Sequence, residues 1–540
     1  MDAIAATPLM TADAFAAALA DPRHAWPSRQ WALLDVREHG AYERGHIPGA
    51  TSLPRRRLEY RVEELVPARA TPVVLYDDGG DDRRAVLAAD DLRGYGYSRV
   101  SVLAHGLAGW RARGGRPATG VNVPCKTFGE RVLAEDRVSH IDAAGLDALR
   151  AAGVRVAIRD VRTAEEFADA HIPTARSAPG FELALRLMDL EADCDTVVVN
   201  CAGRTRSIIG TATLARLGVR SVFALENGTM GWQLDGRALE RGEAGSPPPS
   251  SGSWAHAVAR AEGLARTHGV GFLSPRDLSA LLARPSADVR LIDVRTKDAF
   301  DAGHIAGAAF APGGQAVQRA DDFIAVPGAD VVFVDDGDAR ALLAAYWYRR
   351  MGFPRVHVLA GGVPAWRDSG RRVVQGYARA TPLGLAAATS ACAFLDAANL
   401  SRRLDAPPET RPLVVDVGSS RDLASGHIPG ALWLPRGALE LRAAELPPGR
   451  TVVLASAEEA QSILAARALA RLGREEIYVL EGGIAAWRAA GFSLAEGLPD
   501  GAGADDIVDP PYQRGLTGMR SYLEWEIALH GQSPTPEGGA

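Results

Sequence analysis

Cysteine is scarce in this chain of 540 residues. The four cysteines are Cys125, Cys194, Cys201 and Cys392, and no two of them have the C-x-x-C spacing of a zinc or redox site. So few thiols in so long a chain exclude a small domain held together by disulfides. We therefore expect no disulfide framework, no metal site and no other cofactor, and we expect any functional cysteine to act alone as a thiol.

Lysine is rarer still, because only Lys126 and Lys297 occur and arginine supplies the rest of the 60 basic residues. Alanine and glycine are also abundant, so this bias is typical of codon usage and indicates no arginine-based recognition. Acidic residues number 66, which gives a net charge of -6. Such a chain lacks the overall basic character of proteins that bind nucleic acids or anionic membranes. We expect neither as a partner.

Long hydrophobic runs are missing as well. No window approaches the ~18 uninterrupted apolar residues that a membrane-spanning helix needs. The N-terminal stretch MDAIAATPLMTADAF carries acidic residues where a secretory signal carries basic ones. We expect a cytoplasmic protein, and the sequence leaves its oligomeric state open.

What the sequence does contain is a repeat. The segments LLDVREHGAYERGHIPGA, IRDVRTAEEFADAHIPTA, LIDVRTKDAFDAGHIAGA and VVDVGSSRDLASGHIPGA each begin a unit, and LAHGLAGW, LENGTMGW, LAGGVPAW and LEGGIAAW each close one. The opening aspartates are Asp35, Asp160, Asp293 and Asp416, and the closing tryptophans are Trp110, Trp232, Trp366 and Trp487. Both sets recur in step at more than about 100 residues, which is too long for a solenoid repeat and fits a complete domain.

Within each unit, apolar patterns of two kinds alternate. Runs such as WALLDV and TVVVN predict buried strands, whereas SIIGTATLARLG, apolar at helical spacing and ended by glycine, predicts a helix. This alternation predicts an α/β fold with a central parallel sheet flanked by helices. We place four tandem domains at 7–118, 128–242, 254–373 and 385–496, followed by a tail at 497–540. GEAGSPPPSSG at 242–252 predicts a linker that splits the units into two pairs, and YLEWEIALH near 522–530 predicts a short amphipathic helix that docks back.

The loop after the central strand of each unit lies where an open parallel sheet presents its ligand-binding edge. Aligning the strands VVLYDDG, VVVNCAG, VFVDDG and VVLASA brings four residues to one position: Asp77, Cys201, Asp335 and Ser456. Only the second unit offers a thiol there. Its loop, CAGRTRS, runs through Cys201, Ala202, Gly203, Arg204, Thr205, Arg206 and Ser207.

Each residue type in this loop has a physical reason. The start of the following helix, together with Arg204 and Arg206, supplies the positive potential that favours a thiolate. Gly203 can adopt backbone angles closed to other residues, which lets successive N–H groups converge on an anion. A cysteine after an apolar strand is otherwise most often a small buried side chain. The glycine and two arginines therefore favour a reactive Cys201.

Over about residues 10 to 495 the sequence resembles the rhodanese superfamily of sulfurtransferases, four times over. The D-V-R and G-H-I-P-G-A segments, the strand-to-cysteine loop and the G-G-x-x-A-W ending all match. The resemblance implies that the loop cysteine takes a sulfane sulfur from a small donor and passes it, as a persulfide, to an acceptor such as a thiol or cyanide. The donor stays open among thiosulfate, mercaptopyruvate and a low-molecular-weight persulfide.

The resemblance also implies roles for individual residues. Cys201 is the nucleophile, the loop from Ala202 through Gly203 and Thr205 to Ser207 forms the anion cradle, and Arg204 and Arg206 bind the anionic group of the donor. Arg186, in the segment PGFELALR, is implied to face the substrate, with a solvated helix residue as the equal alternative. The chain is similar to a bacterial four-domain subgroup in which one unit is active.

Two other classes of function stay open. A non-catalytic scaffold, or a sulfur-carrier or interaction protein, is disfavoured because one loop alone keeps its cysteine, glycine and both arginines. A phosphatase or arsenate reductase is disfavoured because the phosphatases of this fold have a C-x5-R loop, whereas Cys201 and Arg206 form a shorter C-x4-R.

Several other residues have a structural explanation that we favour. The histidines of the G-H-I segments, His46, His171, His304 and His427, recur in units without a thiol. The aspartates of the D-V-R segments recur in the same way and are expected to accept hydrogen bonds that fix a turn. Cys194 precedes Cys201 by seven residues, and we interpret it as a bystander rather than a resolving thiol.

Overall fold

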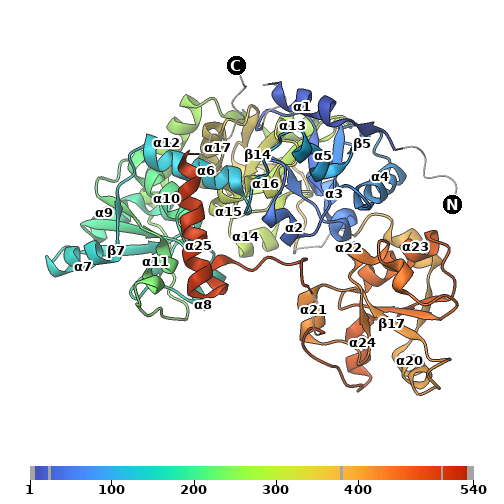
Figure 1. Ribbon diagram of the computed structural model, residues 1–540. Coiled ribbons are helices and arrows are strands. Elements are labelled where there is room, and N and C mark those ends of the chain that lie inside the picture. Colours follow the sequence, from blue (N-terminus) through green and yellow to red (C-terminus); the bar gives the residue numbers. More distant parts are fainter. Residues whose placement is uncertain (1–6, 22–25, 377–380, 500–502, 532–540) are drawn as a thin grey trace.

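The computed structural model describes residues 7–21, 26–376, 381–499 and 503–531, and within them it contains four five-stranded parallel sheets (Figure 1). Every sheet has the same order, in which the first strand of the unit is followed by the fifth, fourth, second and third. Helices flank each sheet, so the predicted four-domain α/β fold is confirmed. The predicted strands WALLDV and TVVVN and the predicted helix SIIGTATLARLG are all present.

The first two units have matching elements. Unit 1 contains β1 (Leu9–Met10), α1 (Ala12–Ala20), β2 (Ala32–Asp35), α2 (His39–Arg44), β3 (Thr51–Ser52), η1 (Arg55–Arg57), α3 (Leu58–Leu65), β4 (Val73–Tyr76), α4 (Arg84–Gly94), β5 (Val100–Leu103) and α5 (Gly106–Ala112). A connecting helix, α6 (Val123–Glu135), follows. Unit 2 contains β6 (His140–Ile141), α7 (Ala143–Ala151), β7 (Val156–Asp160), α8 (Ala164–Asp169), β8 (Arg176–Ser177), η2 (Gly180–Arg186), α9 (Leu187–Asp193), β9 (Thr196–Asn200), α10 (Thr205–Arg216), β10 (Val222–Leu225) and α11 (Gly228–Leu234).

The second half repeats the pattern. Unit 3 follows α12 (Ser251–Thr267) and contains β11 (Gly271–Leu273), α13 (Pro275–Leu282), β12 (Val289–Asp293), α14 (Lys297–Ala302), β13 (Ala309–Phe310), α15 (Gly313–Gln318), α16 (Ala320–Phe323), β14 (Asp330–Val334), α17 (Ala339–Met351), β15 (Val356–Leu359) and α18 (Gly362–Asp368). Unit 4 follows α19 (Leu385–Ala391) and contains β16 (Ala393–Leu395), α20 (Ala397–Leu404), β17 (Leu413–Asp416), α21 (Ser420–Ser425), β18 (Leu432–Trp433), α22 (Arg436–Leu439), η3 (Ala443–Glu445), β19 (Val452–Ala455), α23 (Glu459–Arg471), β20 (Ile477–Leu480) and α24 (Gly483–Ala489). The tail contains η4 (Pro511–Gln513), α25 (Gly515–Ala528) and η5 (Leu529–Gly531).

The repeated aspartates and histidines fix the turns, as the sequence predicts. In units 1 to 3 the aspartate accepts hydrogen bonds from the backbone and guanidinium of the arginine two residues later, as Asp160 does from Arg162 at 3.0 Å. In unit 4 the residue two positions after the aspartate is Gly418, which donates only its backbone N–H to Asp416. Burial raises the pKa of the Asp416 carboxyl to about 6. In each G-H-I segment, Nδ1 of the histidine lies 3.0 Å from the carbonyl oxygen four residues earlier. Each of these histidines thus makes a local contact that supports the fold.

Units 2 and 3 pack against each other through a single hydrophobic core. Helix α12 lies against α17, and α17 also packs on η2. Trp347 of α17 is fully buried and donates a hydrogen bond to the hydroxyl of Thr213 in α10 at 2.9 Å. The predicted linker at 242–252 therefore joins two units that share a core, and the two pairs of units on either side of it are not independent. Apolar surface on both sides of the linker is buried only when units 2 and 3 stay together.

Unit 1 contacts both units 3 and 4. Ala325, Val326 and Ala329 of unit 3 belong to the same hydrophobic cluster as the sheet of unit 1. On the other side, Arg55 of unit 1 pairs with Glu440 of unit 4 at 2.9 Å. Unit 4 thus attaches to the rest of the molecule through unit 1.

The tail returns from unit 4 to unit 2, where α25 packs against α11 and α6 (Figure 1). Met519 and Leu523 of α25 pack on Met230 of α11 in a small buried cluster. The predicted docking of an amphipathic helix at the C-terminus is confirmed.

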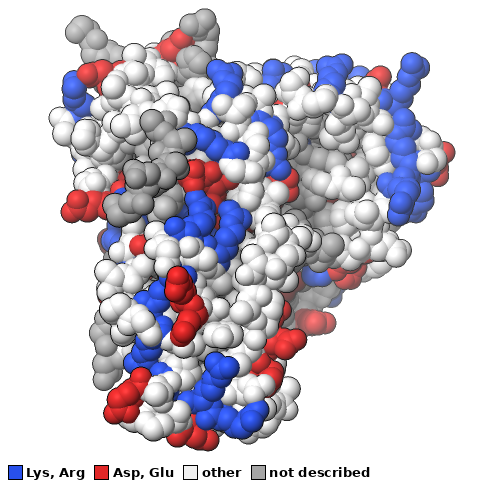
Figure 2. Space-filling view, turned by 90° about the vertical axis from the view of Figure 1, so that its right-hand side faces the viewer, with Lys and Arg blue, Asp and Glu red and all other residues white. Residues whose placement is uncertain are grey.

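The surface carries both signs of charge. On the face shown in Figure 2, basic and acidic side chains are interspersed rather than gathered by sign. Among the described residues, no helix combines the length and apolar character needed to cross a membrane.

The shared core makes a prediction for limited proteolysis. A protease should cut within residues 242–250, which are largely exposed and precede α12. Because units 2 and 3 share a core, the two fragments should remain one particle in native size-exclusion chromatography and separate only in denaturant. Separation of the fragments under native conditions would contradict the shared core.

Candidate functional site

Cys201 lies directly after the central strand β9 and four residues before α10 begins. Its carbonyl oxygen accepts a hydrogen bond from the N–H of Thr229 at 2.9 Å, which ties the loop to the start of α11. The side chain is 2% exposed, and its sulfur lies 3.5 Å from the hydroxyl of Ser207. The loop thus holds one thiol between the end of a strand and the start of a helix.

The same backbone hydrogen bond identifies the equivalent residue in the other units. Leu107 donates to Asp77, Val363 donates to Asp335, and Ile484 donates to Ser456, at 2.8, 2.8 and 3.1 Å. The alignment of these positions with Cys201 is therefore confirmed by the structure. Among these four equivalent residues, a thiol occurs in unit 2 alone.

In units 1 and 3, the aspartate at this position accepts hydrogen bonds from backbone N–H groups of its own loop. The carboxylate of Asp335 accepts hydrogen bonds from the N–H groups of Gly337 at 2.8 Å and Ala341 at 2.9 Å. Asp77 does the same with Gly79 and Ala85, at 3.0 and 2.9 Å. The side chain of the loop itself takes the place of a bound anion.

The Cys201 loop leaves its N–H groups open. Within the described part of the chain, no acceptor lies at hydrogen-bond distance of the N–H groups from Ala202 to Arg206. A helix start with unsatisfied N–H groups is a ready site for an anion. In the aspartate loops, by contrast, the carboxylate already takes up two of the N–H groups.

Gly203 serves a different purpose from the one predicted. It does not adopt a left-handed backbone conformation, unlike many other glycines of the chain. A Cβ atom at Gly203 would instead lie 2.9 Å from Cε of Met230 and 3.3 Å from Oε2 of Glu526. A larger side chain here would therefore have to displace the end of Met230 or Glu526, because α11 and α25 approach the loop closely.

A cavity of about 570 Å³ opens on the loop, and Cys201 is among its lining residues. Unit 2 contributes the loop, unit 1 contributes His39 and Glu43, and unit 3 contributes Arg319 and Asp322. Lys126 comes from α6, while Arg514, Tyr522, Trp525 and Glu526 come from the tail. The sequence predicts only the unit 2 residues, because the rest reach the site from segments far away in the chain.

The two loop arginines are both held by carboxylates. Arg204 forms two hydrogen bonds with Glu130 of α6, at 2.7 and 2.8 Å. Arg206 forms two with Glu166 of α8, at 2.6 and 2.8 Å. Burial would raise the pKa of Glu166, but Arg206 outweighs it and lowers that pKa to about 2. The guanidinium groups predicted to bind a donor therefore already have ligands within the protein.

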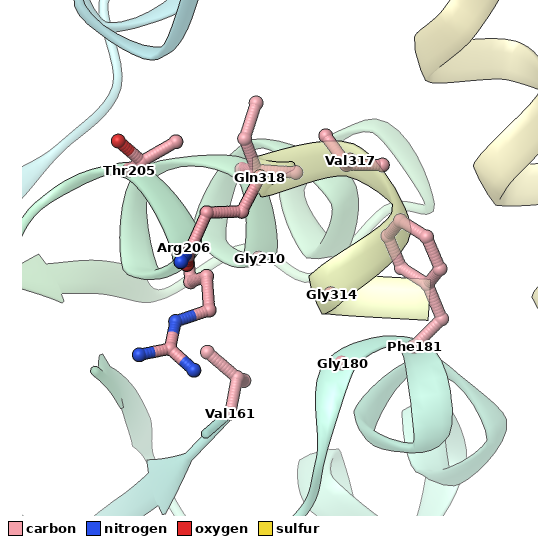
Figure 3. Close-up of a pocket in the computed structure, with 10 residues that line it drawn as sticks. Val161, Gly180, Phe181, Thr205, Arg206, Gly210, Gly314, Val317 and Gln318 are labelled. Carbon is pink, nitrogen blue, oxygen red and sulfur yellow. The ribbon is translucent and has the colours of Figure 1, made fainter. Parts of the chain in front are cut away.

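Figure 3 shows the rear of this helix start, where a small hollow separates α10 from unit 3. The side chain of Arg206 points toward Val161, and that of Thr205 points the other way. Gly180 and Gly314 meet back to back, and a Cβ at Gly180 would lie 2.5 Å from the backbone nitrogen of Gly314. Unit 3 thus supports the reactive loop from behind.

Arg186 and the remaining cysteines lie elsewhere. Arg186 does not line the cavity with Cys201, and its guanidinium reaches the carbonyl oxygen of Ser246 at 3.5 Å. Cys194 precedes β9 whereas Cys201 follows it, so an extended strand separates them by roughly 20 Å. This agrees with a bystander role for Cys194. Cys125 is fully buried beside Asp321 at the contact of α6 with unit 3.

Comparisons with known proteins agree with this geometry. The family model for the rhodanese-like domain matches residues 11–113, 142–235, 274–369 and 396–490. The chain is similar to a crystal structure of thiosulfate sulfurtransferase from Pseudomonas aeruginosa, with a TM-score of 0.86 and 35% identity over 97% of each chain.

Two curated proteins match single units. A sulfurtransferase from Allochromatium vinosum is 34% identical over 107 residues, which are 20% of this chain and 96% of that protein. Arsenate reductase 2.1 from Oryza sativa subsp. japonica is 34% identical over 116 residues, which are 19% of this chain and 72% of that protein.

The pairing of Arg206 predicts a stability effect. Arg206→Met removes the only guanidinium bonded to the buried carboxylate of Glu166, which would keep the N–H of Thr163 at 3.2 Å but no bonded cation. We expect a loss of about 3–5 kcal/mol in the free energy of unfolding. The double variant Arg206→Met/Glu166→Gln should recover most of it. Denaturant unfolding followed by circular dichroism measures both.

A matched control is Arg155→Met, because Arg155 pairs with Asp195 on the surface. Exposed pairs contribute little, so its unfolding midpoint should barely move. If Arg206→Met were as mild as Arg155→Met, the buried pair would not hold the loop.

Proposed function

Since the chain belongs to the rhodanese-like domain family, we propose that it is a sulfurtransferase with one active centre, at Cys201. The observation that carries the proposal is the contrast between the loops. The two aspartate loops fill their anion cradle with their own carboxylate, and the fourth unit has the hydroxyl of Ser456. The loop of Cys201 combines a thiol with unsatisfied N–H groups.

The first step loads the cysteine. The thiolate of Cys201 attacks the outer sulfur of a donor such as thiosulfate, the sulfur–sulfur bond of the donor breaks, and sulfite leaves with the electron pair. Cys201 then carries a terminal persulfide anion. The loop N–H groups from Ala202 to Ser207 and the start of α10 stabilise this anion.

The second step returns the thiol. A thiolate or cyanide attacks the terminal sulfur, the Cys201 thiolate leaves, and the acceptor carries the transferred sulfur away. No electron donor or metal ion is needed for this balance. All four cysteines are free, which supports a reducing location such as the cytoplasm.

In this reaction Arg204 and Arg206 act through the loop. Each is bound to a carboxylate on another helix, α6 or α8, so each clamps the loop to its surroundings. We assign Arg186 no contact with the donor, because it lies outside the cavity.

Arsenate reduction is the second candidate, because the rice protein named arsenate reductase matches one unit. The loop length argues for sulfur transfer. With only four residues between Cys201 and Arg206, the cradle is tighter than the C-x5-R loop of the phosphatases and suits a single sulfur atom better than a tetrahedral oxyanion. A non-catalytic scaffold would need none of these features.

The proposal predicts where sulfur is carried. After incubation with thiosulfate, mass spectrometry should find one added sulfur atom, 32 Da, on the peptide that contains Cys201 (~1 per chain). Cys201→Ser should abolish it. Cys125→Ser is the matched control, because the Cys125 thiol is buried and its burial raises its pKa. This variant should carry the same label as the wild type. Transferable sulfur on any other cysteine would overturn the single centre.

A further inference from the structure

Five cationic side chains other than His39 line the cavity at Cys201, and four of them are already bound. Each of the four is a guanidinium group within hydrogen-bond distance of a carboxylate. The pairs are Arg204 with Glu130 at 2.7 Å, Arg206 with Glu166 at 2.6 Å, Arg319 with Asp322 at 2.8 Å and Arg514 with Glu43 at 2.7 Å. The fifth cation is Lys126, and it is different.

Lys126 lies in the first turn of α6, outside all four sheets. Its side chain is 9% exposed, and its ammonium nitrogen lies 3.8 Å from Oε1 of Glu526. That separation exceeds hydrogen-bond length, so the carboxylate does not take up the N–H donors as it does in the four arginine pairs. The ring of Tyr522 lies 5.6 Å from the same nitrogen, and the Tyr522 hydroxyl is a second polar neighbour of the ammonium, a neutral one that leaves its charge unbalanced.

Glu526 lies between the ammonium of Lys126 and the Cys201 loop. Its Oε1 accepts a hydrogen bond from the hydroxyl of Thr205 at 2.6 Å, and the same oxygen faces Lys126. Its Oε2 is buried and has no hydrogen-bond partner among the described residues. A nine-tenths buried ammonium and an unpartnered carboxylate oxygen thus face a cavity that also contains Cys201.

We propose that Lys126, held in place by Glu526 of α25, binds the anionic end of the sulfur donor while the outer sulfur meets Cys201. This rests on the proposed function and names the residue that recognises the donor. The recognising cation then comes from the helix between units 1 and 2 and from the tail, rather than from the cysteine loop. The donor class is a small oxyanion such as thiosulfate.

The choice of lysine has a physical reason. An ammonium is a compact point charge with three rotatable donors, which can turn from Glu526 to a ligand, whereas the planar fork of arginine fits a carboxylate with two parallel hydrogen bonds. An arginine at this position would be taken up by Glu526, as the other four are by their partners. The chain has only two lysines, and one of them lines the cavity that contains Cys201.

Steady-state transfer by the full-length protein from thiosulfate to cyanide tests the proposal. Lys126→Met should raise the KM for thiosulfate by about 10- to 150-fold, as expected for the loss of one charge-assisted hydrogen bond, with a smaller change in kcat. Lys126→Arg should fail to restore the KM. Lys297→Met, which removes the only other lysine from an exposed pair with Asp301, should match the wild type.

Two further measurements keep the outcome clear. Lys126→Met/Glu526→Gln removes both charges, so an unchanged melting temperature with a raised KM excludes a folding defect. Isothermal titration calorimetry of thiosulfate with full-length Cys201→Ser, with and without Lys126→Met, measures the affinity for the donor without turnover. If the wild-type protein fails to load sulfur, the proposed function is rejected. If the two Cys201→Ser proteins bind thiosulfate equally well, or if Lys126→Met leaves the KM unchanged, the role of Lys126 is overturned.

Discussion

Backbone N–H groups at the start of a helix have no partner within the helix, and a buried helix start must find one. Every unit of this protein faces that constraint at the same point, where the central strand passes into a helix. Asp77 and Asp335 meet it with a carboxylate from the loop itself. At Cys201 the N–H groups remain open. The proposed chemistry of the chain depends on this one difference.

The other units take part in the site although they carry no thiol. Unit 3 supports α10 through a shared core and the close contact of Gly180 with Gly314. Unit 1 and the tail close the cavity from the other side, and Glu526 reaches the loop through Thr205. These contacts join segments hundreds of residues apart, which supports the proposal that the fourfold repeat is a scaffold for one centre rather than a row of equal ones.

The repeats make the fold predictable from the sequence, since local patterns of strand, helix and loop recur four times, and they single out Cys201 as the one thiol at the equivalent loop position. The partners of Arg204 and Arg206 were not predictable, because Glu130 and Glu166 lie on separate helices brought in by tertiary packing. The shared core of units 2 and 3 was not predictable for the same reason. The sequence did contain one signal for the proposed donor site, because Lys126 is one of only two lysines among many arginines. Composition alone does not distinguish a rare residue from a functional one.

The central claim is that one centre is assembled from unit 2 and the tail, and a chain that ends at Asp509 tests it most directly. This truncation keeps the contacts of Asp505 and Asp506 with units 1 and 4 but removes α25. The measurement is the single-turnover rate at which thiosulfate loads sulfur onto Cys201, with circular dichroism to establish folding. The account predicts a folded protein that loads at least about tenfold more slowly, as for the loss of one charged hydrogen bond. Loading at the full-length rate would contradict it.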